Sequence, residues 1–161
     1  MEPDIALLLA TDPDLCVRAT VAVHAAVEDT VLAAWLSGAD GALAMAVYER
    51  KELPANLAGA AAVSDFAEVR SEAFRRWPDN PAVQAAIALY GTEQERVALC
   101  ALPHLPADVI GFLLKDSADA VVQKLIERPS LPETILLELF ASRPALRTRL
   151  VLHPAISQET L

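Results

Sequence analysis

Aromatic side chains are scarce in this sequence, and cysteines and long apolar runs are scarce with them. Only 5% of the 161 residues are aromatic, and the two cysteines are too few for a disulfide framework or a cysteine metal cluster. The longest uncharged runs, such as Leu53–Ser64 and Asn80–Thr92, fall short of the ~20 apolar residues that a membrane span requires. The acidic start at Glu2 and Asp4 carries no secretory signal pattern. We therefore expect a cytoplasmic protein without membrane association.

Basic side chains are also few. There are 13 Lys and Arg residues against 22 Asp and Glu residues, which gives a net charge of −9 and a pI near 4.7. This balance argues against the basic footprint of a nucleic-acid binder. The chain is nevertheless 54% hydrophobic, which is too apolar for a disordered protein. Most of these residues are Ala, Leu and Val, and Ala and Leu favour helices, so a folded helical chain is expected.

Prolines recur at a regular interval and reveal an internal repeat. Leu105-Pro106 and Leu131-Pro132 each precede an apolar segment that predicts a short helix. Each unit is taken to begin three residues before this proline, at Pro103 for Pro106 and at Pro129 for Pro132. Equivalent positions recur every 25–27 residues, at Ala25, Lys51, Pro78, Pro103, Pro129 and Pro154. Four residues before each of these positions the side chain is always apolar, at Val21, Val47, Phe74, Leu99, Leu125 and Leu150. We therefore predict repeat units at about 1–24, 25–50, 51–77, 78–102, 103–128 and 129–153, and a partial unit at 154–161.

Each unit has the pattern of two short helices. The first helix follows the second proline, and the second helix ends at the proline that opens the next unit. Expected caps of the second helices are Asp12, Asp65 and Asp116, and capping boxes are expected at Asp65–Glu68 and Thr92–Glu95. Helices this short are marginal alone and must stack. We predict an all-α fold, a single-domain α-solenoid of about six two-helix repeats over residues 1–161; its last turn fits either a frayed cap or a domain cut from a longer chain.

The repeated pattern resembles the leucine-rich repeat variant family and is similar to HEAT-like repeats. The resemblance is carried by Asp12-Pro13, Val17-Arg18, Val69-Arg70, Leu105-Pro106 and His153-Pro154. It implies a right-handed superhelix in which the first or second helix of a unit can tighten into a 3₁₀-helix. Some members carry an iron–sulfur cysteine cluster beside the repeats, and this sequence lacks those cysteines, so no cofactor is expected.

Large side chains stand at the end of each predicted second helix. Cations there complement the helix C-terminus, which is the structural interpretation. The functional interpretation is that stacking aligns them into a stripe that binds a partner, because Trp and Arg are favoured interface anchors. The candidate stripe residues are Arg50, Arg75, Arg76, Trp77, Arg128 and His153.

A second column of arginines, with Arg18, Arg96 and Arg147 in register and Arg70 one position off, predicts pairs with a cap Asp or a carbonyl of the adjacent unit. An alternative is a ladder that grips an anionic partner.

Acidic side chains concentrate in the first part of the chain. Residues 1–69 hold 11 acidic and 3 basic side chains, a net charge of −8. This excess keeps an apolar chain in solution, or it forms an acidic end that meets a basic protein. The candidate residues of that end are Asp4, Asp12, Asp14, Glu28 and Asp29.

No catalytic or metal-binding pattern stands out. His24, His104 and His153 lie in separate units without ligand spacing, and Cys16 and Cys100 read as buried, inert thiols. The sequence therefore favours a non-catalytic protein-interaction module without metal or cofactor. The alternatives are an acidic inhibitor or immunity-like binder, a regulatory repeat domain of a longer protein and, remotely, a HEAT-like nucleic-acid-modifying enzyme.

Overall fold

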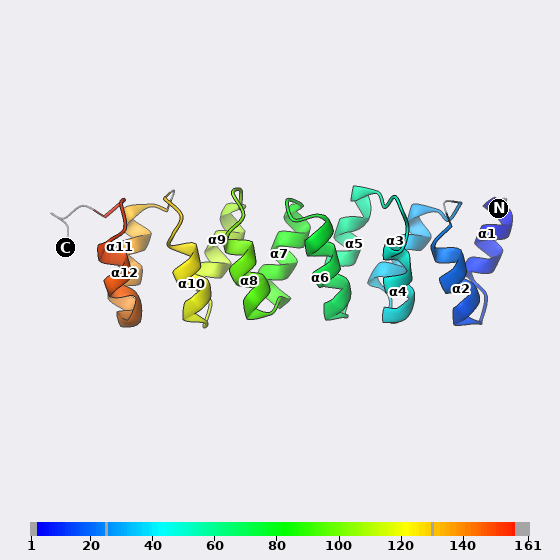
Figure 1. The fold of residues 1–161 in the computed structure, drawn as a ribbon, viewed down its shortest axis with the longest axis horizontal. Helices are drawn as coiled ribbons and strands as arrows, with labels where there is room; N and C mark the ends of the chain where they lie inside the picture. The colour runs from blue at the N-terminus through cyan, green and yellow to red at the C-terminus, as the bar shows by residue number, and fades with distance from the viewer. Residues whose placement is uncertain (1–2, 25, 130, 157–161) are drawn as a thin grey trace. The chain divides into compact units, whose positions relative to one another are not determined.

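The chain is all-helical in the part that the computed structural model describes, which comprises residues 3–24, 26–129 and 131–156 (Figure 1). These ranges hold twelve α-helices, two 3₁₀-helices and no strand. The all-α prediction is confirmed. The chain divides into two compact units, Met1–Gly91 (unit 1) and Thr92–Leu161 (unit 2). The division falls between the two predicted helices of residues 78–102, where a Gly ends one helix and a capping Thr begins the next.

Unit 1 contains seven α-helices in two layers. They are α1 (Pro3–Ala10), α2 (Leu15–Ala22), α3 (Asp29–Ser37), α4 (Gly41–Tyr48), α5 (Ala58–Ala62), α6 (Ala67–Arg76) and α7 (Pro81–Tyr90), with the 3₁₀-helix η1 (Ala55–Leu57) leading into α5. Helices α2, α4 and α6 contact one another in sequence, and α3, α5 and α7 do the same. The second and first helices of the predicted repeats thus form separate layers within this unit.

Unit 2 contains α8 (Glu93–Cys100), α9 (Ala107–Leu114), α10 (Asp119–Leu125), α11 (Glu133–Ser142) and α12 (Arg147–Val151), with the 3₁₀-helix η2 (Pro144–Leu146) before α12. Helix α10 packs against α8 on one side and η2 on the other. Helix α9 lies against α10, and α11 lies against η2 and α12. Each 3₁₀-helix directly precedes a five-residue α-helix, η1 before α5 and η2 before α12.

The predicted apolar columns form the core. Of the six side chains four residues before the repeat boundary, five are buried, and Phe74 is half-buried. Cys100 is also buried, as predicted, and only 1% exposed. Cys16, in contrast, is exposed, so the prediction of a buried thiol there is wrong. Cys16 lies in the first turn of α2, where Leu15 and Val17 are half-buried instead.

Helix caps are the second point at which prediction and structure differ. The capping box of Thr92 and Glu95 is present, with the Thr92 backbone N–H donating to Glu95 Oε2 at 2.7 Å. Helix α2, however, is capped by Asp14 and not by Asp12, and α6 begins after Phe66, so the Asp65–Glu68 box is wrong. Asp116, three residues before the first residue of α10, accepts from the Ala118 backbone N–H at 2.9 Å, but the N-cap of α10 is Ala118, so the prediction of Asp116 as the cap is wrong.

Candidate interaction surface

Arg50 ends the turn after α4 and reaches back to the end of α2. Its Nη1 donates to the carbonyl of Ala22 at 2.7 Å and also to the carbonyl of His24. The last carbonyls of a helix have no partner within the helix, so this guanidinium satisfies two acceptors of the preceding second helix. The side chain is buried, and its Nε has no hydrogen-bond partner. Burial lowers the pKa of this guanidinium, while the charge of Asp29 acts against that shift.

Arg128 makes the equivalent contact in unit 2. Its Nη1 donates to the carbonyl of Cys100 at 3.1 Å and to that of Leu102, and its Nη2 donates to the carbonyl of Pro103 at 2.8 Å. Its Nε is buried without a partner, as in Arg50. Both guanidinium groups therefore cap the C-terminal end of α2 or α8 from the end of the next second helix. The structural interpretation of this column, a cation at a helix C-terminus, is confirmed for both residues.

His153 continues the column after α12. Its Nδ1 accepts from the backbone N–H of Ala155 at 3.1 Å, so the ring proton is assigned to Nε2. Nε2 lies 3.3 Å from the carbonyl of Arg128 and donates to it. A neutral imidazole thus takes the place that a guanidinium has one repeat earlier.

Trp77 itself makes no such contact, and the neighbouring Arg76 does so in its place. Arg76 Nη1 donates to the carbonyl of Tyr48 at 3.4 Å, and its guanidinium lies 5.8 Å from the centre of the Tyr48 ring. The Trp77 and Tyr48 rings are 6.2 Å apart. The Tyr48 hydroxyl donates to the carbonyl of Val69, and burial raises the pKa of this phenol well above its ordinary value. Arg76 and Trp77 are therefore held against α4.

Arg75 is the candidate stripe residue that is most open to solvent. Its side chain is 70% exposed and pairs with Glu72, at 2.8 Å from Nε and 2.5 Å from Nη2. The hydrogen bond from Arg75 lowers the pKa of Glu72. Arg50 and His153 are buried, whereas Arg76, Trp77 and Arg128 are half-buried.

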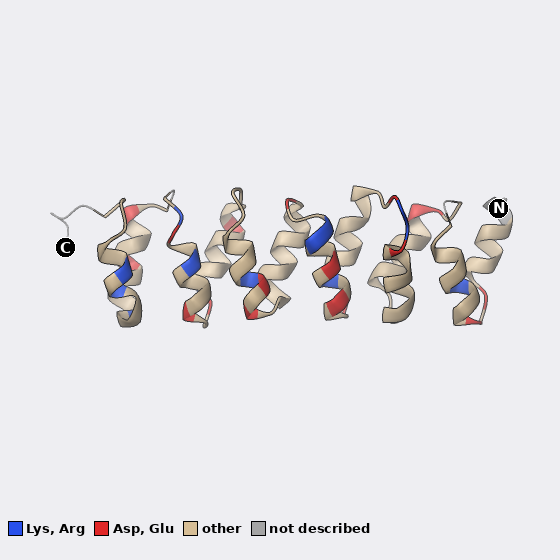
Figure 2. Cartoon of the chain, viewed as in Figure 1, with Lys and Arg blue, Asp and Glu red and all other residues tan. Residues whose placement is uncertain are grey.

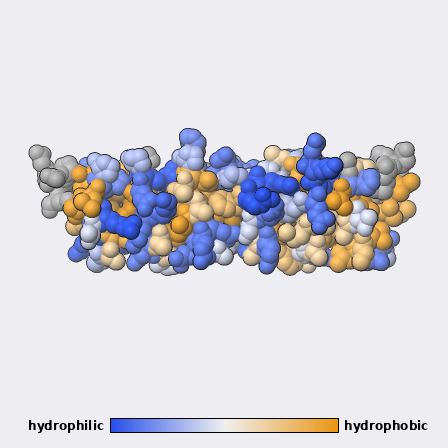
Figure 3. Space-filling view, viewed as in Figure 1, coloured by the Kyte–Doolittle hydropathy of each residue, from blue (hydrophilic) through white to orange (hydrophobic). Residues whose placement is uncertain are grey.

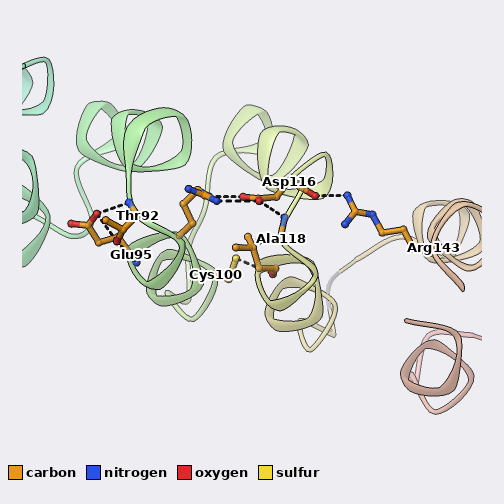
Figure 4. A network of polar contacts seen from close by, with 8 residues as sticks. Thr92, Glu95, Cys100, Asp116, Ala118 and Arg143 are labelled. Atoms are coloured by element: carbon orange, nitrogen blue, oxygen red, sulfur yellow. Dashed lines mark hydrogen bonds and ion pairs between the residues drawn. The ribbon is translucent and has the colours of Figure 1, made fainter. Parts of the chain in front are cut away.

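Two members of the other arginine column, Arg18 and Arg96, reach an Asp of the adjacent predicted unit, most clearly around Asp116 (Figure 4). Arg70 and Arg147 instead donate to the carbonyls of Ser64 and Phe140 within their own units, so the predicted contact with the adjacent unit is wrong for them. Arg96 Nε and Nη2 lie 2.5 and 3.2 Å from the Asp116 carboxylate, and Arg143 donates to the Asp116 carbonyl from the following loop. Burial alone would raise the pKa of Asp116, but the hydrogen bonds from Arg96 and from the Ala118 N–H lower it overall. Arg18 lies 3.9 Å from Asp40, the cap of α4, so pairing with an Asp before the next second helix is confirmed twice.

Three open hollows occur beside the ends of second helices. The α2–α4 hollow, about 410 Å³, is lined by Val23 and residues 49–52. The α8–α10 hollow, about 370 Å³, is lined by residues 100–103 together with Lys124, Glu127, Arg128 and Pro129. The α10–α12 hollow, about 330 Å³, is lined by Gln123, Ile126, Glu127, Arg149, Leu152, His153 and Pro154. The last two share Glu127, so they adjoin at this residue, and together they are called the unit 2 groove.

The acidic candidates lie in α1, in the turns before α2 and α3, and at the first residue of α3 in unit 1, where Figure 2 marks acidic residues in red. Asp12 and Asp14 each accept a backbone N–H at 2.8 Å, and Asp29 accepts from Asn56 Nδ2 at 2.9 Å. Glu28 precedes α3, with its Oε2 3.4 Å from the Thr30 hydroxyl. The side chain of Asp4 lies outside the described part of the structure. Asp12 and Asp14 thus bind local backbone N–H groups. Asp14, Glu28 and Asp29 are exposed, whereas Asp12 is half-buried.

Exposed apolar side chains are the feature that sequence reasoning missed. Val151 and Leu152 end α12 at 48% and 80% exposure, and hydrophobic atoms lie beside hydrophilic ones over that helix (Figure 3). The signal that marks Leu152 is its place outside the buried column, which Leu150 occupies with no exposed surface.

No family model, curated protein or solved structure matches this chain. Within the described ranges, no group of three or more His, Cys, Asp and Glu side chains could hold a metal ion. None of the described helices combines the length and hydropathy that a bilayer crossing requires.

Proposed function

We propose that this chain is a non-catalytic protein-interaction module. Its architecture in this proposal is a right-handed α-solenoid of about six two-helix repeats. Support comes from contacts between residues one repeat apart, such as Arg50 to Ala22 and Arg128 to Cys100, each separated by 28 residues. Stacked repeats create extended binding surfaces because every unit presents the same face.

The observation that carries the proposal is the recurrence of hollows at equivalent places. Each lies where consecutive second helices end, beside Arg50, Arg128 or His153. These three side chains are bound to carbonyls, so they shape the hollows, while neighbouring exposed side chains such as Lys51 and Arg149 are available to a partner. The proposed partner is a protein that contacts the hollows of one or both units.

A second candidate is an acidic inhibitor-like binder of a basic protein. It is favoured by the exposed carboxylates of Asp14, Glu28 and Asp29 in unit 1, a part of the chain with few cations. Complementary charge would speed association with a basic surface and would make it sensitive to salt.

Site-specific photo-cross-linking tests whether a partner contacts the α2–α4 hollow. A photoreactive amino acid replaces Glu52, in the α2–α4 hollow, or Asp65, which is exposed before the first residue of α6. The proposal expects a protein cross-linked from position 52 in the native source and not from position 65. The reverse result would move the interaction to the other end of the helices. Substituting Lys51→Glu should weaken the product at position 52, with Lys115→Glu as the control for the same change of charge.

A further inference from the structure

The groove of unit 2 has a local charge opposite to that of the chain. Its lining carries three cations, Lys124, Arg128 and Arg149, against the single carboxylate of Glu127. Glu127 is itself paired, since its Oε2 lies 2.6 Å from Lys124 Nζ and its Oε1 lies 3.6 Å from Arg149 Nη1. One carboxylate cannot neutralise all three cations. The groove is therefore net positive in a protein of net charge −9.

The two hollows of this groove differ in chemistry. The α8–α10 hollow presents Lys124 beside the Arg128 guanidinium, whose N–H groups are bound to carbonyls of segment 100–103, whereas the α10–α12 hollow presents Leu152 and Pro154. Leu152 is 80% exposed, whereas Ile126, which lines the same hollow, is buried. The first hollow suits an anionic group, and the second suits an apolar one.

The spacing of the hollows favours an extended ligand. Packed helices lie about 8–10 Å apart, so hollows between successive second helices are separated by roughly that distance. A polyproline II segment rises about 3.1 Å per residue with three residues per turn, so its side chains at i and i+3 share a face about 9 Å apart. Such a segment can place one side chain in each hollow without bending.

We infer that the unit 2 groove binds an extended, proline-rich acidic segment of a protein partner, with a carboxylate seated at Lys124 and an apolar side chain three residues away at Leu152. The inference rests on the proposed interaction role and adds the chemistry of the partner. Opposite charge commits the groove to this occupant, and the exposed cations Lys124 and Arg149 guide its approach.

Fluorescence anisotropy with a labelled peptide of tandem Pro-Pro-Glu-Pro-Pro-Leu units tests this inference on the intact chain. The wild-type protein should bind this peptide more tightly than the same peptide with Lys in place of Glu, although its net charge would favour the basic one. Arg149→Glu should weaken binding of the acidic peptide by about tenfold. Added salt should weaken the remaining binding less than it weakens binding to the wild type. Lys115→Glu, an exposed substitution at the end of α9, should leave binding within about twofold.

The apolar seat has its own variant pair. Leu152→Ser should weaken binding of the acidic peptide. Val63→Ser, which changes another exposed apolar side chain in unit 1, should not. Equal binding of the Glu and Lys peptides, or equal losses in Arg149→Glu and Lys115→Glu, would overturn the inference. Retention of the position-52 cross-link in that case would leave the proposed function standing, and loss of both would reject the two together.

Discussion

Arg128 donates through Nη1 to the carbonyl of Cys100, which lies 28 residues earlier at the end of α8. The same relationship joins Arg50 to Ala22 and Arg76 to Tyr48, again over 28 residues. Carbonyls at a helix end are left without intrahelical partners, and here the next repeat provides them. Neighbouring second helices are thus joined by polar contacts as well as by packing.

Replacing Arg128 should destabilise unit 2, because three backbone carbonyls lose their hydrogen-bond donor. Arg128→Leu leaves the acceptors of Cys100, Leu102 and Pro103 without their donor, and an unsatisfied buried acceptor costs about 1–3 kcal/mol. The free energy of unfolding from urea titration should fall by that amount. Arg75→Leu is the matched control, because that side chain is 70% exposed and pairs only with Glu72 on its own helix. Equal losses in both variants would contradict a specific capping role.

Asp116 should make stability depend on acid pH. Its pKa in the folded chain lies below the ordinary value of 3.8, so its ionised form stabilises the fold above that pH. This contribution is lost as pH falls below about 3.8 through the folded pKa, because protonation removes the pairing with Arg96. Asp116→Asn should be less stable than the wild type at neutral pH, and the difference should shrink in acid. Asp119→Asn, at a half-exposed carboxylate, should show a smaller difference throughout.

The two thiols should react at very different rates. Cys100 is 1% exposed, and burial raises its pKa to about 11, so it holds little thiolate at neutral pH. Cys16 is exposed in α2. Iodoacetamide at pH 8 should therefore alkylate Cys16 in the native protein and reach Cys100 only in denaturant, as peptide mass spectrometry would record. Comparable native rates would mean that α8 and α10 open readily.

Two glycines should respond oppositely to alanine. A Cβ at Gly111, within α9, would meet nothing within 4 Å, so Gly111→Ala should stabilise unit 2 by about 0.5–1 kcal/mol through helix propensity. A Cβ at Gly91 would lie 2.5 Å from the Ile87 carbonyl oxygen, so Gly91→Ala should destabilise the end of α7. Thermal unfolding of both variants measures the signs. A stabilised Gly91→Ala protein would show that this turn relaxes easily.

The capping prediction was correct where the two hydrogen-bonded residues lie within one turn of the same helix. Thr92 and Glu95 are three residues apart, so their reciprocal hydrogen bonds follow from a single helix start. The predictions failed at Asp12, Asp65 and Asp116, because α2 begins after Asp14, α6 after Phe66 and α10 after Ala118. Capping depends on which backbone N–H groups remain unpaired, and a shift of one or two residues changes the answer.

Exposure of single side chains depended on packing between helices. Cys16 and Cys100 both stand among apolar neighbours in sequence, but only Cys100 faces α10, where its sulfur lies 3.6 Å from the Val121 carbonyl. Leu152 and Leu150 likewise differ by two residues and have opposite surroundings. Composition cannot separate such pairs, because the direction of a side chain is set by the helix phase against its neighbours.

The order of residues along the chain was sufficient for the helical class, because proline, caps and apolar spacing act on the nearest turns of backbone. It was also sufficient for the buried column that includes Leu99 and Leu125. The partners of Arg50 and Arg128 emerged only from the folded arrangement. Their acceptors lie a full repeat away, where no local preference of the backbone reaches, so packing alone brings donor and carbonyl together.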